Sequence, residues 1–364
     1  TFMTQGDTHG HENNKVFSYQ IKKEEPTIIT VLGGVGAKSL NVLSKGEHVE
    51  GLDYCVMGDG ERIFEKIIKE NERPNKTKYL EDIIYDLDSL EFPKRKAFDT
   101  ERYIKILQKV NTLNRNERYL NIFTSKGCDW GKCTFCTVDR HYRTKSPEKI
   151  RAEVEYLVEE FKITKLFTCD DNFFCYKDPE RTYRICETLQ KFPYLKWSVG
   201  ETRVTDFVKN VNLGKKILRK MRGSGCVEIN WGAESGDPQL LKNMQKGISP
   251  SDIEMAIRMT TEAGMISKLL LMYNLPGETK ESLDNTLNFV KNLLVKYPIN
   301  FLKVSEYANI PGTIDWYRGH NSDVSKTDVE GFMSELSDFC SVNNIVLSFL
   351  NWERTGDEKS SCRI

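Results

Sequence analysis

Apolar and polar residues recur along the chain with the periods of short buried strands and amphipathic helices. From residue 119 onwards, short apolar segments alternate with longer segments that carry an apolar stripe of helical period. The segments predicted as strands are 119–123, 165–169, 195–199, 226–231, 267–272 and 301–306. Helices are predicted to begin after the cap Ser146 and to cover roughly 179–191, 213–222, 250–263 and 280–296.

This order of elements predicts an α/β fold class, a partial (β/α)6 TIM-like barrel, because successive strand–helix units form curved parallel sheets. Upstream, two short strands, 27–32 and 53–57, each end at a glycine turn, which predicts a partial Rossmann-like layer. The predicted domains are this layer (1–71), a charged, proline-punctuated linker (72–115), the barrel (116–313) and a C-terminal extension (314–364). The extension is expected to hold a helix, 324–340, and a strand-like segment, 344–350.

Polar and special residues follow the predicted barrel strands at the point where each strand ends. In chain order they are Cys128, Cys133 and Cys136, then Asp170 and Asp171, then Glu201 and Arg203, then Glu234 and Ser235, then 274–278, then Tyr307 and Asn309. The carboxyl ends of the strands in a parallel barrel lie at one rim, where active sites of this architecture are built. We therefore expect the chemistry at this rim.

Charge and cysteine usage exclude several classes of protein. Lysine plus arginine and aspartate plus glutamate number 53 each, so no global charge favours nucleic acid or an anionic membrane as a partner. The longest apolar run, 269–273, is too short to cross a bilayer. Ten cysteines in 364 residues do not form a dense secreted disulfide framework, which favours a reducing, cytoplasmic location.

The three clustered cysteines, Cys128, Cys133 and Cys136, leave three kinds of site open. With His141 they match a tetrahedral Cys3His zinc site. Cys133 and Cys136 alone form a redox CxxC pair, which leaves Cys128 unexplained. Three thiolates also hold a 4Fe-4S cluster with one iron open to a further ligand. The spacing alone does not choose between zinc and the cluster.

The flanking residues resemble those of the radical S-adenosylmethionine (SAM) superfamily, and most closely the subgroup with a cobalamin-binding domain ahead of the radical domain. The resemblance spans about residues 27–313. Its motifs are the cysteine loop from Gly127 to Cys136 with Phe135 before the last cysteine, the Asp-Asp-x-Phe segment 170–173, Gly-x-Glu-Ser at 232–235, Pro-Gly-Glu-Thr at 276–279, Pro-Gly-Thr at 311–313, and the upstream segments 33–34 and 57–61. Each motif is weak alone, but their order along the predicted elements makes the set specific.

Three features depart from the family pattern. Four residues separate Cys128 from Cys133, where three are usual. Asn274 stands where a glycine is usual, at the expected adenine edge of the SAM pocket. The resemblance also implies a full cobalamin-binding domain ahead of residue 27, of which only the last two strand ends are recognisable.

The resemblance implies a set of cofactors and residue roles. Cys128, Cys133 and Cys136 would ligate a 4Fe-4S cluster whose open iron binds SAM, and SAM cleavage would yield a 5′-deoxyadenosyl radical that abstracts hydrogen from an unactivated C–H. An external electron donor of the flavodoxin or ferredoxin type would supply the electron. The other residues expected at the cofactors are Phe135 beside the cluster, Asp170 or Asp171 on the SAM ammonium, Arg203 on its carboxylate, Glu234 and Ser235 on the ribose or amino-acid part, and the backbone of Met272 to Asn274 on the adenine.

Each assignment has a simpler alternative. The two aspartates would also serve as caps of the following helix, Arg203 as a surface ion pair, and Ser235 as part of a turn. Trp130, inside the cysteine loop, would either shield a cluster from solvent or simply pack.

Three functions are consistent with these features. The first is cobalamin-dependent methylation, or a related modification, of a peptide or small-molecule natural product. The second is a cobalamin-independent radical SAM rearrangement, epimerisation, cyclisation or dehydrogenation. The third, more remote, is a non-catalytic zinc-stabilised binding module.

Overall fold

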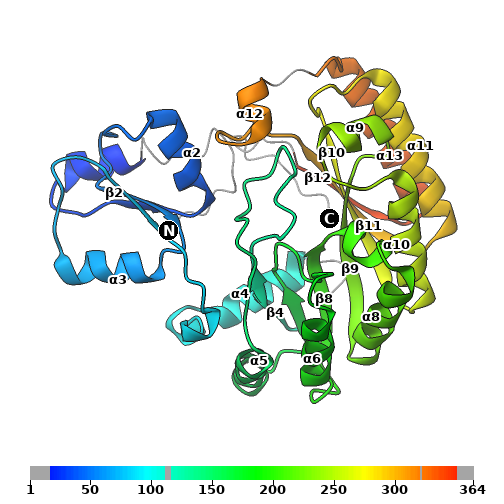
Figure 1. Cartoon of the computed structure of the whole chain (residues 1–364), viewed down its shortest axis with the longest axis horizontal. Helices are drawn as coiled ribbons and strands as arrows, with labels where there is room; N and C mark the ends of the chain where they lie inside the picture. Colours follow the sequence, from blue (N-terminus) through cyan, green and yellow to red (C-terminus); the bar gives the residue numbers. More distant parts are fainter. Residues whose placement is uncertain (1–16, 111–115, 320–321, 351–364) are drawn as a thin grey trace. The chain divides into compact units, whose positions relative to one another are not determined.

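Most of the chain folds into a curved parallel sheet with helices on its outer side (Figure 1). The computed structural model describes residues 17–110, 116–319 and 322–350. The chain divides into two compact units, a smaller one (Thr1–Tyr85, Cys133–Asp139 and Tyr307–His320) and a larger one (Asp86–Lys132, Arg140–Glu306 and Asn321–Ile364).

The larger unit is a part-barrel of seven parallel strands in the order β12-β11-β10-β9-β8-β7-β4. Its strands are β4 (Tyr119–Ile122), β7 (Lys165–Thr168), β8 (Lys196–Thr202), β9 (Cys226–Glu234), β10 (Ile266–Tyr273), β11 (Ile299–Glu306) and β12 (Val346–Leu350). A two-stranded antiparallel ribbon, β5 (Ser125–Lys126) with β6 (Arg143–Thr144), follows β4. The predicted fold class is confirmed, and β12 extends the parallel sheet beyond β11.

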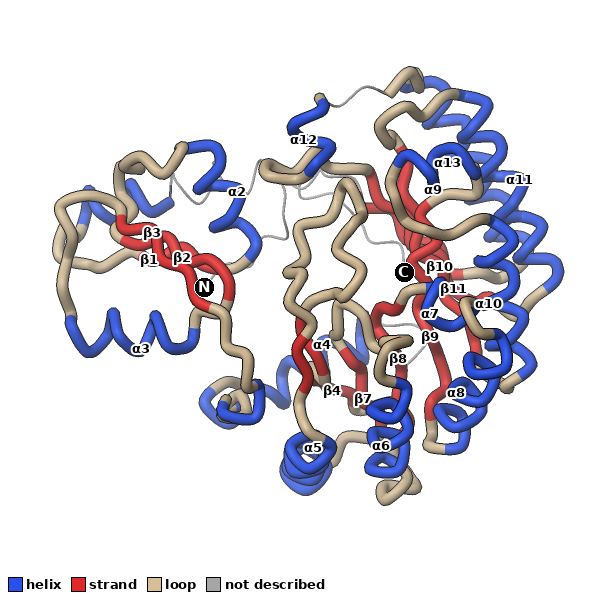
Figure 2. The backbone as a smooth tube through the Cα atoms, in the orientation of Figure 1, coloured by secondary structure: helices blue, strands red, loops and turns tan. Residues whose placement is uncertain are grey.

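Helices connect successive strands and cover one face of this sheet (Figure 2). They are α4 (Thr100–Val110), α5 (Pro147–Phe161), α6 (Pro179–Leu189), α7 (Val204–Val208), α8 (Val211–Gly223), α9 (Pro238–Asn243), α10 (Pro250–Glu262), α11 (Lys280–Lys296) and α13 (Lys326–Val342). Their starts follow from local chemistry. The side chains of Ser146, Asp178 and Thr279 accept hydrogen bonds from the first-turn N–H groups of α5, α6 and α11.

The burial of β10 shows which face of the sheet remains open. Ser267, Leu269, Leu271 and Tyr273 are buried, whereas the residues between them are only partly buried. A strand turns successive side chains to opposite faces, so one face packs against helices and the other lines the concave interior of the part-barrel. Met272, at the carboxyl end of the strand, therefore lines the concave face.

The amino ends of the strands are joined by a buried charge network. Glu228 on β9 receives Lys165 of β7 at 2.7 Å, Lys268 of β10 at 3.2 Å and the hydroxyl of Ser198 on β8 at 3.0 Å. The two ammonium groups keep the pKa of Glu228 below its usual value although burial acts in the opposite direction. This network fills the concave face near the amino ends of the strands. It does not extend to the carboxyl ends, where the candidate site residues lie.

The smaller unit contains a three-stranded parallel sheet in the order β1-β2-β3. Its strands are β1 (Val31–Gly33), β2 (Tyr54–Gly58) and β3 (Lys78–Asp82), and its helices include α2 (Val35–Ser44), α3 (Glu61–Glu70) and α12 (Ile314–Arg318). Gly58 has φ +73°, and a Cβ there would lie 2.2 Å from the carbonyl oxygen of Asp82, so only glycine fits where β2 meets β3.

The segment expected as a linker, 72–115, carries β3 and α4. β3 was not predicted because it has charged residues at three of five positions and no buried residue, so the strand period is absent. The proposed domain boundaries stay a prediction.

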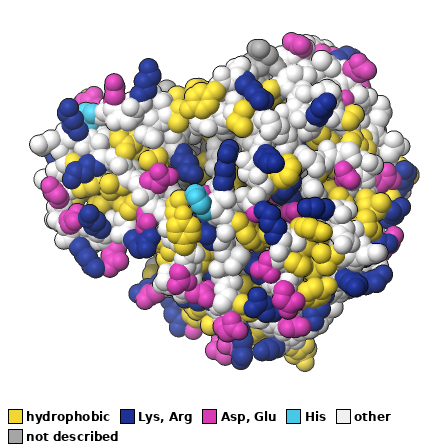
Figure 3. All heavy atoms as spheres, viewed as in Figure 1, with side chains coloured by type: hydrophobic (Ala, Val, Ile, Leu, Met, Phe, Trp, Pro, Cys, Tyr) yellow, Lys and Arg dark blue, Asp and Glu magenta, His cyan; other side chains and the backbone are white. Residues whose placement is uncertain are grey.

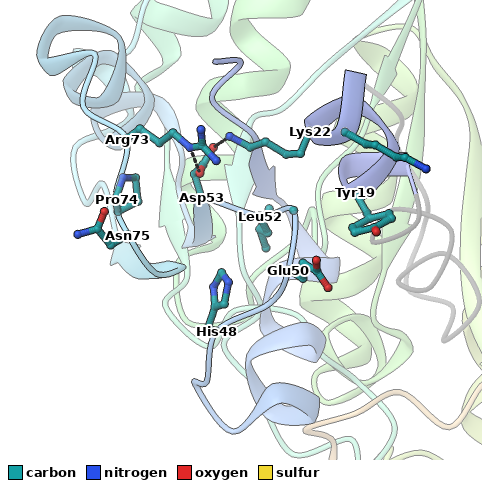
Figure 4. A pocket seen from close by; sticks show the side chains of 11 residues that line it. Tyr19, Lys22, His48, Glu50, Leu52, Asp53, Arg73, Pro74 and Asn75 are labelled. Atoms are coloured by element: carbon teal, nitrogen blue, oxygen red, sulfur yellow. Dashed lines mark ion pairs between the residues drawn. The ribbon is translucent and has the colours of Figure 1, made fainter. Parts of the chain in front are cut away.

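Asp53, whose carboxylate is buried, is one of the residues that line a hollow of about 340 Å³ in the smaller unit (Figure 4). Lys22 lies 2.6 Å from this carboxylate and Arg73 3.5 Å from it. The backbone N–H of Thr30 also donates to it, at 2.8 Å. Asp53 thus serves to join the residues before β1, the start of β2 and the segment before β3.

The surface carries charges of both signs. On the face drawn in Figure 3, Lys and Arg side chains are interspersed with Asp and Glu. Across the part of the chain that the structure describes, no helix combines the length and the apolar character that a bilayer crossing requires.

Candidate functional site

The loop between β4 and the first cysteine is fixed by a buried carboxylate, Asp170. It accepts hydrogen bonds from the N–H (2.7 Å) and hydroxyl (2.9 Å) of Thr124 and from the N–H and hydroxyl of Ser125. Arg181 of α6 donates to the Thr124 hydroxyl at 2.7 Å. Burial raises the pKa of Asp170. Because both oxygens of Asp170 accept hydrogen bonds from Thr124 and Ser125, this carboxylate holds the loop in place.

The neighbouring carboxylate, Asp171, is exposed and reaches the cysteine loop itself. It accepts the backbone N–H of Gly127 at 2.7 Å, next to Cys128. The following helix is capped by Asp178, so the helix-cap interpretation of the two aspartates is wrong. Of the two, Asp171 remains the carboxylate with access to a ligand.

The three cysteines are partly exposed, and no disulfide joins any of them to another described cysteine. The division between the two units falls between Lys132 and Cys133, so Cys128 is described with the barrel and the other two with the smaller unit. In the smaller unit, the N–H of Cys136 donates to the carbonyl of Cys133 at 3.3 Å, and the N–H of Val138 donates to the sulfur of Cys136 at 3.4 Å.

Thiol donors with a backbone N–H directed at one sulfur suit an iron–sulfur cluster, since hydrogen bonds to sulfur are a recurrent feature of such sites. Phe135 is partly buried and His141 is exposed. Within the described ranges, no three His, Cys, Asp or Glu side chains are already gathered around one metal position. The assignment of the three thiols as ligands therefore stays a prediction.

Asn172 joins several parts of the rim, and sequence reasoning gave it no role. Its amide oxygen accepts the hydroxyl of Thr202 at 3.2 Å and the N–H of Arg203 at 3.1 Å, both at the end of β8. Its amide nitrogen donates to Asp206 at 3.0 Å and to Asp129 of the cysteine loop at 3.4 Å. Its place after the two aspartates was the available signal, but its partners lie 30 to 43 residues away.

Arg203 is buried, with 8% of its surface exposed, so the surface ion-pair interpretation is wrong. Its guanidinium carbon lies 4.2 Å from the ring centroid of Trp130. One terminal nitrogen donates to the hydroxyl of Thr205 at 3.2 Å and to the carbonyl of Lys246 at 3.3 Å. Among the residues that the structure describes, the Nε atom has no hydrogen-bond partner.

Glu234 and Ser235 point to different surroundings. Glu234 has φ +63° and pairs with Lys246 at 2.5 Å. A Cβ at Gly232 would lie 2.8 Å from the Glu234 carboxylate, so glycine at this position makes room for the pair. The hydroxyl of Ser235 lies 2.9 Å from that of Thr286 on α11, away from this pair.

Asn274 has φ +61°, in the left-handed region that glycine and asparagine adopt most readily. The departure from the usual glycine is thus explained by backbone conformation. Its side-chain amide donates to Glu306 at 3.4 Å. The next turn is held by Glu278, which is fully buried and accepts the N–H of Leu275 at 3.1 Å and that of Asn274. Burial raises the pKa of Glu278 to about 7.

Glu201 is the second acidic group at the rim with a strongly shifted pKa. The residue is exposed, but protein atoms surround its carboxylate. The resulting desolvation raises the pKa of Glu201 to about 7. The nearby carboxylate of Glu234 acts in the same direction, and Lys246 and Lys303 oppose it. The sequence placed Glu201 at the rim without assigning it a role.

Residues 122–290 match the family model described as the radical SAM superfamily. An uncharacterized methyltransferase of Pyrococcus horikoshii is 25% identical over 303 residues, which cover 81% of this chain and 58% of the relative. An anaerobic magnesium-protoporphyrin IX monomethyl ester cyclase of Cereibacter sphaeroides is 28% identical over 286 residues, which cover 72% and 44%. The chain therefore spans about half the length of these curated relatives.

Two solved structures share the fold. The cobalamin-dependent S-adenosylmethionine radical enzyme OxsB with aqua-cobalamin bound superposes with a TM-score of 0.59 at 17% identity, over 93% of this chain and 47% of that one. The radical SAM methyltransferase TsrM from Kitasatospora setae, with tryptophan and a SAM analogue, gives a TM-score of 0.59 at 16% identity over 81% and 58%.

Proposed function

We propose that the chain is a radical SAM enzyme, since residues 122–290 match the model of that superfamily, whose members use a 4Fe-4S cluster and SAM, and that Cys128, Cys133 and Cys136 ligate the cluster. The observation that carries this proposal is the anchoring of the first cysteine. Asp170 holds residues 124–125 and Asp171 holds Gly127, so the end of β4 and the start of the cysteine loop have a defined course. A zinc-stabilised module is not proposed, since the family is one of enzymes.

The candidate SAM contacts lie along the same rim. Asp171 accepts hydrogen bonds from the SAM ammonium, and Arg203, with its unpartnered Nε, donates to the carboxylate. Glu234 binds the ribose or the amino-acid part, and the backbone of Met272 to Asn274 meets the adenine. Ser235 acts behind the site through Thr286. Asp170 acts through the loop that it anchors.

The cluster and SAM, when bound, supply a 5′-deoxyadenosyl radical that abstracts hydrogen from an unactivated C–H. The chain orients the cofactors and excludes water around them. An external donor of the flavodoxin or ferredoxin type supplies the electron.

We propose cobalamin-dependent methylation, or a related modification, of a peptide or small-molecule substrate. The support is that TsrM is a methyltransferase, that OxsB is described with aqua-cobalamin bound, and that the Pyrococcus relative is called a methyltransferase. The magnesium-protoporphyrin ester cyclase favours a second candidate, a cyclisation or another radical rearrangement.

Anaerobic reconstitution with iron and sulfide tests the cluster. We expect about four irons per chain and SAM cleavage to 5′-deoxyadenosine in the wild type. Cys133→Ala should lose both, whereas the control Cys340→Ala, on α13, should keep both. Stoichiometric zinc without iron, or deoxyadenosine formation by Cys133→Ala, would overturn the assignment.

A corrinoid test separates the two reaction classes. The full natural protein is purified from cells supplied with cobalamin, and its absorbance and turnover are measured with and without added methylcobalamin. Corrinoid-dependent turnover supports methylation. Turnover without any corrinoid supports cyclisation or rearrangement instead.

A further inference from the structure

The four-residue spacer between Cys128 and Cys133 is attached to the barrel rather than extended into solvent. The carboxylate of Asp129 accepts hydrogen bonds from Asn172 at 3.4 Å and from the thiol of Cys175 at 3.5 Å. Lys177 lies 3.4 Å from the same carboxylate. The extra residue of this loop therefore belongs to a segment with its own fixed contacts.

Trp130, the second residue of the spacer, contacts the segment 245–247 directly. Its indole N–H donates to the carbonyl of Gln245 at 2.9 Å. A Cβ at Gly247 would lie 2.6 Å from the indole ring, so only glycine allows the ring to lie there. Gln245 and Gly247 both have positive φ, +52° and +73°. The backbone of this segment is thus shaped to meet the indole.

The same indole stacks on Arg203. The guanidinium carbon is 4.2 Å from the ring centroid, within the range of a cation–π interaction. Because Arg203 is buried, this interaction is not screened as it would be in water. The guanidinium also donates to the carbonyl of Lys246, so it is held from two sides, while its Nε has no partner in the described part of the chain.

The segment 245–247 also contacts Glu234, because Lys246 pairs with the carboxylate of Glu234. The segment is held at its other end by Thr205, whose hydroxyl donates to the carbonyl of Gly247 at 3.1 Å. Trp130 therefore contacts both Arg203 and the segment that carries the partner of Glu234.

We propose that Trp130 is a positioning residue, which couples the cysteine loop to Arg203 and to the Lys246–Glu234 pair and so sets the site for a ligand carboxylate. This rests on the proposed function, in which that carboxylate is the one of SAM. It also gives the lengthened spacer a purpose, because the spacer is what places the indole over the guanidinium.

The test measures SAM binding by equilibrium dialysis and iron per chain on the reconstituted, unreduced protein. Trp130→Ala should weaken SAM binding about tenfold without loss of iron, because it removes the stacking partner of Arg203. Trp130→Phe, which keeps an aromatic face, should stay within about threefold of wild type. Trp130→Leu keeps bulk without a π-face and should resemble Trp130→Ala. Lys177→Ala, which loses only an exposed contact of the same loop, is the matched control.

A double-mutant cycle completes the test. Arg203→Ala should weaken binding at least as much as Trp130→Ala, and the double variant should be no weaker than Arg203→Ala alone. Additive losses, unchanged affinity in Trp130→Ala and Trp130→Leu, or loss of iron in these variants would each overturn the coupling. A wild type that binds neither iron nor SAM would instead contradict the proposed function.

Discussion

Replacing Glu278 with glutamine should make the stability of the barrel less dependent on pH. Glu278 is fully buried, and one of its oxygens, Oε1, has no hydrogen-bond partner within the described ranges. Burial raises its pKa from 4.5 to about 7. A shift of this size corresponds to about 3 kcal/mol of preference for the neutral acid in the folded protein.

The sign follows from this shift. In the unfolded chain Glu278 ionises near its ordinary pKa, whereas in the folded barrel it keeps its proton up to about pH 7. Its contribution is therefore fully present below the unfolded pKa and is lost as pH rises through the folded pKa. Wild-type stability should fall by about 3 kcal/mol from this group between about pH 4.5 and pH 8.

Glu278→Gln mimics the neutral acid, because its amide oxygen can accept the same N–H groups of Asn274 and Leu275. We expect the variant to lie within about 1 kcal/mol of wild type at pH 5 and to exceed it by up to about 3 kcal/mol at pH 8. Urea unfolding of the cluster-free protein, followed by fluorescence of the buried Trp197 and Trp231, measures this.

Glu281→Gln, on the exposed side of α11, is the control for loss of one negative charge. The reasoning is refuted if Glu278→Gln changes stability by the same amount at pH 5 and pH 8. In that case the ionised carboxylate would be as well accommodated as the acid.

Three further predictions concern the strand ends. Glu228→Ala should destabilise the barrel by about 3–5 kcal/mol in urea unfolding, because it leaves Lys165 and Lys268 buried without their partner. Asn274→Val should cost about 1–2 kcal/mol by the same measurement, since a β-branched residue is strained at φ +61°, while Asn274→Gly should stay within about 1 kcal/mol of wild type. Asp170→Ala should cost about 3 kcal/mol and lower iron loading on reconstitution, since buried N–H groups lose their acceptor.

Each of these has a contrasting variant. Glu155→Gln breaks an exposed ion pair with Arg151 and should change stability by less than about 1 kcal/mol, so an equal effect of Glu228→Ala would contradict its buried role. Equal stability of Asn274→Val and Asn274→Gly would contradict backbone strain. Full iron loading in Asp170→Ala would remove Asp170 from the support of the cysteine loop.

The fold was predictable where the hydrophobic period is strong. α11 was predicted at 280–296 and lies there, and β11 begins two residues before its predicted start. β3 was not predicted, because an edge strand that pairs on one side only needs no buried residue. Periodicity reports burial, so it does not detect elements that bury little.

The site was predictable only to the level of segments. The rim segments were identified because polar residues follow each strand. Which side chain of each segment meets a ligand depends on partners distant in sequence, such as Thr124 for Asp170 and Thr286 for Ser235. The role of Trp130 needed the position of Gly247, 117 residues further along the chain, and a single sequence carries no signal for that pairing.

In two of the rim segments, neighbouring polar residues have different roles. Asp170 is bonded to the loop after β4 whereas Asp171 is exposed, and Ser235 is bonded to α11 whereas Glu234 pairs with Lys246 over Gly232. In each pair the two residues have different partners, so one can build the rim while the other is available to a ligand. A paired motif at such a rim therefore does not imply two ligand contacts. For this chain we expect substitutions of Asp170 and Ser235 to affect folding and cofactor loading first. Substitutions of Asp171 and Glu234 should affect SAM affinity first.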